Sequence, residues 1–345
     1  MLRQQDVGHR IVVRRIVGIR EGRPLFSDAL GELVELSETH LTLATAQGPL
    51  RVPVAQVHRA KRVPPTRRPT AAAVVALERA ADEAWPAPTR GRLGDWLLRS
   101  AEGWTGRANS ALPIGDPDRP LPAAVDAVER WYAERGQPAI INTPLPLAAP
   151  VGAELDDRSW GTRPPTLVQT APLPLPPAPT VAATSGAGVG APGGRPAVGG
   201  GGEAPEVGGA AAAVVEVVTA PSAEWLAVAA GRKGGLPDAA RHVLTAVGQV
   251  RFAHVYVDGT LVAIGRGTVT GEGRWLGLSL IEVLPTVRRQ GLARRVIGAL
   301  AAWGVSVGAT HAFLQVEQHN TAAVALYRTL GFVTHHTYLT RVAPG

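Results

Sequence analysis

Over residues 214–345 the spacing of apolar residues alternates between the period of a strand and that of a helix. The runs 251–257 and 261–269 flank Asp258-Gly259, a dipeptide typical of a tight β-hairpin. Further along, helices are expected over 292–308 and 321–330, and strands over 312–316 and 332–339. The pattern predicts the order strand, two short helices, three antiparallel strands, helix, strand, helix, strand.

A loop rich in arginine and glycine joins the third antiparallel strand to the next helix. It reads Arg288-Arg-Gln-Gly291-Leu-Ala293. Gly291 lets the backbone turn without a Cβ clash, and the first helical turn presents N–H groups that have no intrahelical partner. These amides, the helix dipole and the guanidinium groups suit a diphosphate. In isolation, an ordinary strand–turn–helix with a solvated basic face would show the same pattern.

A second motif follows one helix and one strand later. Asn320, Ala323, Leu326-Tyr327 and Gly331-Phe332 fit the pattern Asn-x-x-Ala-x-x-Leu-Tyr-x-x-x-Gly-Phe. Together with the loop pattern Arg/Gln-x-x-Gly-x-Gly/Ala, it makes residues 214–342 resemble the GNAT superfamily of acyl-CoA-dependent N-acyltransferases. The resemblance implies an α/β (mixed α+β) fold, with a central, mostly antiparallel sheet flanked by helices. It also implies acetyl-CoA as acyl donor and a primary amine as acceptor, reacting directly in a ternary complex.

The resemblance further implies which residues bind and react. Main-chain groups of the strand Ile281-Glu282-Val283 would bind the pantetheine arm and the thioester. Asn320 and Ala323 would contact the coenzyme, and Tyr327 would protonate the leaving thiolate, whose pKa is about 8.5 against about 10 for a phenol. The pyrophosphate would be bound by Arg288, Arg289, Gln290, Gly291, Leu292, Ala293 and Arg294. Alternatively, Tyr327 only packs its ring and Asn320 is a helix N-cap.

The general base is left open by the sequence. The resemblance places a glutamate two residues before Glu317 in some relatives, whereas this chain has Gln315. Glu282 and Glu317 are the candidate carboxylates, and each is equally compatible with an ordinary strand position. His319, His335 and His336 could titrate near neutrality, but clustered histidines beside strands are more often solvated surface. Their spacing fits no metal motif, so no metal is expected.

Composition narrows the class of protein. The chain contains no cysteine, which excludes disulfides, thiolate metal sites and a cysteine nucleophile. The first residues lack the apolar core of a signal peptide, and no apolar run approaches the roughly 20 residues of a spanning helix. A cytoplasmic protein without membrane contact is expected. Usage rich in Ala, Gly, Pro and Arg with one Met is typical of a GC-rich bacterial source.

Composition also divides the 345 residues into units. From 172 to 209, half of the residues are Gly or Pro and none is aromatic, so we expect a disordered linker. Short alternating runs near the N-terminus predict a small β-barrel that resembles SH3-like or Sm-like barrels in pattern only. The predicted units are a barrel at 1–66, an accessory domain at 70–171, a linker at 172–212 and a catalytic GNAT domain at 213–345.

The first 70 residues carry a net charge of +6, whereas the whole chain carries +7. Such a basic unit could bind nucleic acid or an acidic protein. Phe26 is its only aromatic side chain among Phe, Tyr and Trp, which weakens any surface for stacking single-stranded bases. A solvated basic face that aids solubility explains the charge more simply.

The middle region contains a weak internal repeat. Trp131-Tyr132-Ala-Glu-Arg-Gly136 aligns with Leu326-Tyr327-Arg-Thr-Leu-Gly331 at an offset of 195 residues. We therefore predict a degenerate GNAT half that lacks the phosphate loop and does not bind coenzyme, although helix–glycine–strand joints are common. Trp96, Trp104 and the run 106–110 could line a substrate cleft, or be core aromatics and a polar turn.

Two functions remain compatible with the sequence. One is an acetyl-CoA-dependent N-acetyltransferase whose amine acceptor is a small molecule or a protein. The other is a catalytically weak or inactive module that binds coenzyme A, a protein or nucleic acid. The intact loop and Tyr327 favour the enzyme, whereas Gln315 favours the module. The oligomeric state is left open.

Overall fold

The computed structural model describes residues 2–45, 48–63, 69–176, 213–231 and 236–344. These belong to two compact units, residues 1–68 and 69–345. Most of the predicted linker, residues 177–212, lies outside the described residues. Its first residues are not linker-like, because Leu173 and Leu175 pack against the apolar core of the second unit. None of the described helices has the length and apolar character needed to cross a bilayer.

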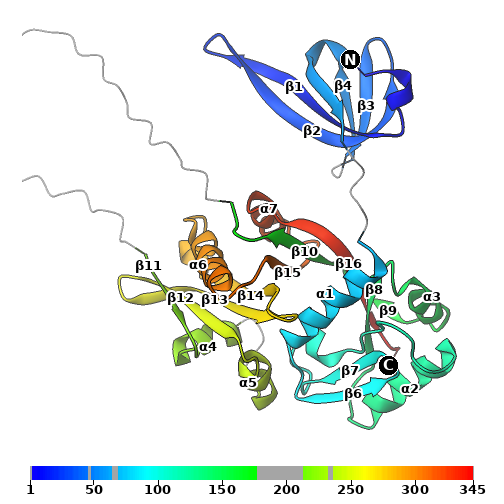
Figure 1. The fold of residues 1–345 in the computed structure, drawn as a ribbon, viewed down its shortest axis with the longest axis vertical. Helices are drawn as coiled ribbons and strands as arrows, with labels where there is room; N and C mark the ends of the chain where they lie inside the picture. Colours follow the sequence, from blue (N-terminus) through cyan, green and yellow to red (C-terminus); the bar gives the residue numbers. More distant parts are fainter. Residues whose placement is uncertain (1, 46–47, 64–68, 177–212, 232–235, 345) are drawn as a thin grey trace, which may run out of the picture. The chain divides into compact units, whose positions relative to one another are not determined.

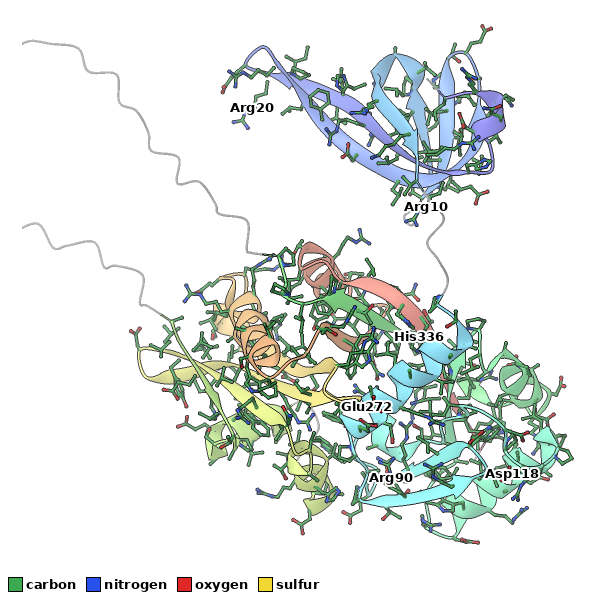
Figure 2. All side chains as sticks on the ribbon, viewed as in Figure 1. Arg10, Arg20, Arg90, Asp118, Glu272 and His336 are labelled. Carbon is green, nitrogen blue, oxygen red and sulfur yellow. The ribbon has the colours of Figure 1, made fainter. Side chains whose placement is uncertain are left out.

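The first unit is an antiparallel sheet in the order β4-β3-β2-β1-β5 (Figure 1). Its strands are β1 (Arg10–Arg20), β2 (Arg23–Leu36), β3 (His40–Thr45), β4 (Gly48–Pro53) and β5 (Val57–Arg62). β1 and β2 form a long hairpin with Arg20 at its tip (Figure 2). Among the described strands no pairing joins β4 to β5, so a closed barrel stays a prediction.

The second unit is built on a nine-stranded sheet in the order β11-β12-β13-β14-β15-β10-β16-β8, with β9 paired to β16. Its strands are β8 (Ile140–Leu145), β9 (Gly161–Thr162), β10 (Thr166–Pro172), β11 (Val214–Val218), β12 (Val250–Val257), β13 (Thr260–Thr270), β14 (Trp275–Val283), β15 (His311–Glu317) and β16 (Val333–Val342). A separate hairpin pairs β6 (Thr89–Leu93) with β7 (Trp96–Ser100). The helices are α1 (Ala71–Glu83), α2 (Leu121–Ala133), α3 (Ala149–Asp157), α4 (Ala223–Gly231), α5 (Asp238–Thr245), α6 (Leu292–Ser306) and α7 (Thr321–Thr329).

From β11 to β16 the elements follow the predicted order, and the mixed, mostly antiparallel sheet is confirmed. Only β14 and β15 pair in parallel within this sheet as described. On one face, Val296, Ile297 and Leu300 of α6 pack against β14 and β15 residues in a large apolar core. On the other face, α4 and α5 pack with Trp85 and Trp104 from the middle region.

Strands of the middle region lie inside this sheet instead of forming a separate one. β10 lies between β15 and β16, antiparallel to both, and β8 pairs with the other edge of β16 (Figure 1). Each half of the second unit therefore gives its last strand to the other half. Segments 70–171 and 213–345 share one sheet, which the linker composition could not indicate.

The strand exchange corrects the register of the predicted repeat. Residues Ala111 and Ile141 pair in parallel on either side of α2, as β14 and β15 do on either side of α6. By topology, β8, α3 and β10 are thus the counterparts of β15, α7 and β16. Matching Tyr132 with Tyr327 was wrong, because it equated α2 with α7. The two tyrosines share only a helix ending, in which each carbonyl accepts the amide five residues later at 3.0 Å.

Buried polar contacts join α1 to the sheet. The fully buried Arg266 of β13 donates to the carbonyls of Ala84, Leu244 and Val243 at 2.9, 2.8 and 3.1 Å. Burial lowers the pKa of its guanidinium to about 9, which leaves the group charged at neutral pH. Its hydrogen bonds span the two halves of the unit.

We expect Arg266→Met to lower the free energy of unfolding of the second unit by at least about 3 kcal/mol, because three buried carbonyls lose their donor. Urea unfolding followed by tryptophan fluorescence measures this unit alone, since all eight tryptophans lie in it. Arg274→Met, at an exposed arginine in the next turn, is the control. Equal losses in the two variants would contradict the role given to Arg266.

Candidate functional site

The parallel strands β14 and β15 separate before either of them ends. Their pairing runs from Trp275–His311 to Leu278–Leu314, whereas β14 continues to Val283 and β15 to Glu317. β15 remains paired on its other edge with β10 as far as Glu317. The two strands thus form a fork, which begins after the pair Leu278–Leu314. It opens because β14 bends away, so main-chain groups of 279–283 on that side do not pair with β15.

A β-bulge in β14 produces this bend. Ser279 lies opposite Arg266 and Glu282 opposite Ile264, so that two residues of β14 face the single residue Gly265. Leu280, inside the bulge, has a φ of 51°. A Cβ at Gly265 would come within 2.3 Å of Val296, so glycine is required where α6 crosses the bulge. Bulge and glycine together hold α6 close against the bent end of β14.

The loop after β14 presents its main chain to solvent at the start of α6. Gly291 is the exposed N-cap and has a φ of 78°. A Cβ at this position would meet no atom within 4 Å, so the backbone conformation, and not crowding, favours glycine. Leu292 is buried and fixes the first turn, whose N–H groups lack intrahelical partners. Of the predicted loop, residues 288–291 are thus exposed, whereas Leu292 is buried.

Positive charge surrounds this helix N-terminus. Between Glu282 and Glu317 the sequence has four arginines and no acidic residue. Arg288 donates to the carbonyl of Val283 at 3.2 Å, and Arg294 donates to the Thr329 hydroxyl at 2.7 Å, which joins α6 to α7. Arg289 and Gln290 are exposed in the loop. An anion at the start of α6 would meet both the helix dipole and these guanidinium groups.

The second motif lies on α7, across the same apolar core. Asn320 is the N-cap, and its side-chain oxygen accepts the Ala323 amide at 3.2 Å, so the capping role is confirmed. The half-buried Tyr327 packs near Phe332, with ring centroids 5.9 Å apart. Ile281, Val283, Ala323 and Tyr327 all pack against the cluster around α6. The structure thus brings the strand end and the tyrosine to one core.

The candidate carboxylates differ in their surroundings. Glu317 is exposed and lies 3.2 Å from His319, which is also exposed. Glu282 is half-buried on β14, opposite Ile264 of β13. Neither contact identifies a base.

The expectation of surface histidines is wrong for His336. This side chain is buried, and its Nε2 lies 2.7 Å from the carboxylate of Glu78 on α1 (Figure 2). Its Nδ1 lies 2.8 Å from Nδ1 of His335, whose pKa is lowered by burial and then by His336. No local pattern could have indicated this pair, because Glu78 and His336 are 258 residues apart.

On the face of the fork opposite α6, Gln315 and part of the predicted cleft lining lie near Tyr338, which sequence reasoning missed. Gln315 follows Leu314, the last residue of β15 that pairs with β14. Its side-chain oxygen accepts a hydrogen bond from the Tyr338 hydroxyl at 3.3 Å. Tyr338 also contacts Arg107, and burial raises the pKa of its hydroxyl. Trp104 stacks on Trp85 at 5.5 Å.

Two other candidates in the middle region are structural. Trp96 belongs to the core of the middle region, as the alternative held. The Asn109 side chain accepts the amides of Ala101 and Gly103 and donates to two nearby carbonyls, so it orders the turn. Among the described residues, no three His, Cys, Asp or Glu side chains are grouped to hold a metal.

The sequence of the chain is similar to those of known proteins. A family model described as "Probable histone acetyltransferase Rv0428c C-terminal" matches residues 71–160 and 203–340. The "Probable histone acetyltransferase Rv0428c" of Mycobacterium tuberculosis (strain ATCC 25618 / H37Rv) is 30% identical over 348 residues, covering 97% of this chain and 95% of that protein. The "Uncharacterized N-acetyltransferase YobR" of Bacillus subtilis (strain 168) is 38% identical over 89 residues, covering 25% of this chain and 35% of that protein.

Among solved structures, a GCN5-related N-acetyltransferase from Kribbella flavida has a similar fold. Its TM-score is 0.54 at 17% sequence identity, and the match covers 81% of this chain and 97% of that one. At this identity the likeness supports the fold alone.

Gly291 and Gly298 form a matched pair for testing the loop conformation, since both are exposed on α6 and both have open space at Cβ. We expect Gly291→Ala to destabilise the second unit by about 1–2 kcal/mol, because alanine is strained at positive φ. Gly298→Ala should stabilise it by up to about 1 kcal/mol, because alanine favours a helix. Tryptophan-detected urea unfolding compares them; the same sign for both would contradict the left-handed N-cap.

Proposed function

The chain belongs to the Rv0428c family of GNAT acetyltransferases, and from this premise we propose that it transfers the acetyl group of acetyl-CoA to a primary amine by direct attack in a ternary complex. The observation that carries the proposal is the exposed, left-handed Gly291 at the start of α6, directly after the bent end of β14. It would supply main-chain N–H groups for an anion beside the end of β14, which does not pair with β15.

Chain groups are available for each part of the donor. The amides of residues 291–294, with Arg288, Arg289 and Gln290, would hold the diphosphate. Main-chain groups of Ile281, Glu282 and Val283 would hold the pantetheine arm, once Arg288 gives up the Val283 carbonyl. Asn320 and Ala323 would border the arm at the start of α7. When bound, acetyl-CoA supplies an activated thioester.

In the proposed reaction the nitrogen of a neutral amine attacks the thioester carbon, and the carbon–sulfur bond breaks. Tyr327 gives its hydroxyl proton to the leaving sulfur, and the amine loses one proton to a base, so protons balance. Glu282 or Glu317 would accept that proton, directly or through water.

Gln315 supports a second candidate function, a coenzyme-A-binding module without turnover. An amide cannot take the amine proton, and Gln315 is instead bonded to Tyr338. Thiol release from acetyl-CoA over a panel of amines separates the two functions. Binding of the coenzyme without release for any amine, including a lysine peptide, would favour the module.

We expect Gly291→Glu to weaken coenzyme A binding by at least about 100-fold, because it combines a strained N-cap with a carboxylate beside the diphosphate. Calorimetric titration with coenzyme A measures the loss. Gly298→Glu adds the same charge on the same helix away from the loop and is expected to bind nearly as the wild type does. Wild-type affinity in Gly291→Glu would show that the diphosphate binds elsewhere.

We expect Tyr327→Phe to lower kcat by about 10- to 100-fold with little change in KM for acetyl-CoA, because a general acid acts on the leaving group and not on binding. Steady-state thiol release with a saturating amine measures both constants. Tyr256→Phe on β12 is the control. An unchanged kcat in Tyr327→Phe would leave the tyrosine with a packing role only.

A further inference from the structure

Arg107 is a cation without a counter-ion on the face of the fork opposite α6. Among the described residues its guanidinium has no salt bridge, and its Nε is buried without a hydrogen-bond partner. Its neighbours are the Tyr338 hydroxyl and the Trp85 ring, whose centroid lies 5.1 Å from its Cζ. Burial lowers the pKa of Arg107, yet a guanidinium stays charged at neutral pH.

Nearby carboxylates are already engaged. Glu78, which acts on Arg107 only at longer range, is hydrogen-bonded to His336. Asp82 pairs with Arg90 and Arg99. A second cation, Arg266, lies over the same Trp85 ring at 5.2 Å and makes this region more positive. A desolvated cation in such surroundings is stabilised most by an anion that arrives from outside.

The position of Arg107 connects it to the fork. Gln315 and Ser279 are the first residues after the last parallel pair, Leu278–Leu314. Gln315 bonds to Tyr338, and Tyr338 contacts Arg107, so the guanidinium lies two side chains from the point where the strands separate. An amine reaching the fork from this face would pass Arg107.

Aromatic packing holds the guanidinium in place. Trp85 stacks on Trp104 with ring planes 13° apart, and its indole nitrogen donates to the Thr105 hydroxyl at 3.1 Å. Arg107 itself follows the turn ordered by Asn109. A guanidinium that is held in place presents a planar set of N–H donors. This set matches a carboxylate, which accepts two parallel hydrogen bonds.

We propose that Arg107 binds a carboxylate of the acceptor, so that the substrate is a small amine that carries a carboxylate, as an amino acid does. The inference rests on the proposed acetyl transfer and narrows its acceptor class. It predicts poor use of polyamines and basic peptides, whose charge the Arg107–Arg266 pair repels.

The kinetic test compares α-, β- and ω-amino acids with their amides, and phosphoethanolamine with ethanolamine, by thiol release from acetyl-CoA. We expect each favoured amino acid to lose at least about 10-fold in kcat/KM as its amide, through KM. Arg107→Gln should raise KM for the amino acid by a similar factor, leave the amide unchanged and keep kcat nearly constant. Arg107→Lys should recover part of the loss.

Arg135→Gln is the matched control, because Arg135 also stacks on a tryptophan ring, that of Trp131, but lies 3.6 Å from a carboxylate of Glu134. It should behave as the wild type. Equal use of amino acids and amides, preference for phosphoethanolamine, or efficient use of a basic lysine peptide would each overturn the carboxylate assignment while leaving acetyl transfer intact.

A binding measurement keeps the inference testable without turnover. Trp85 and Trp104 lie beside Arg107, so binding of an amino acid to the coenzyme-A-loaded protein should change tryptophan fluorescence, whereas its amide should not. If the wild type shows this fluorescence change and Arg107→Gln does not, the carboxylate subsite is supported even when no amine is acetylated. In that case only the proposed acetyl transfer is contradicted. No saturable change with any amino acid, in a protein that also shows no release, would overturn both.

Discussion

The architecture of the second unit depends on a parallel strand pair that is made only in part. β14 and β15 pair over four residues and then separate. Opening a sheet in this way normally exposes two edges, but here β15 is held by β10 along its whole length, from Thr166–Glu317 to Pro172–His311. One side of the fork is thereby rigid, and the bulge at Leu280 bends only the other side.

The strand that makes this possible comes from the half that lacks the phosphate loop. β10 belongs to the middle region, and in return β16 pairs with β8 of that region. The middle region is therefore a structural part of the fork, and it also supplies α1, Trp85 and Arg107 on the face opposite α6. Removal of that half would leave β15 with an unpaired edge and Arg266 without one of its carbonyl partners.

The sequence predicted what depends on short-range chemistry. The turn at Gly291 and the hairpin at Asp258-Gly259 were predicted, and the cap at Asn320 was one of two alternatives; each follows from a few adjacent residues. Strand exchange, the Glu78–His336 contact and the surroundings of Arg107 depend on partners far along the chain. A periodic pattern contains no information about which strand edge another strand will join, so the repeat was aligned on a shared helix ending and not on its topology.

The two halves also differ at the start of two helices that occupy equivalent places in the topology. α6 begins at Leu292 after the N-cap Gly291, and its first turn has all its N–H groups and contains two arginines, Arg294 and Arg295. α2, its counterpart by topology, has Pro120 as N-cap and Pro122 in the first turn, which removes a donor. Asp126 adds a negative charge one turn later, and Arg158 binds both that carboxylate and the Pro122 carbonyl. An arriving phosphate would meet a missing amide and an acidic side chain, and the Arg158 guanidinium is already paired. The same helix position thus offers N–H groups that could meet an anion in one half and serves packing in the other.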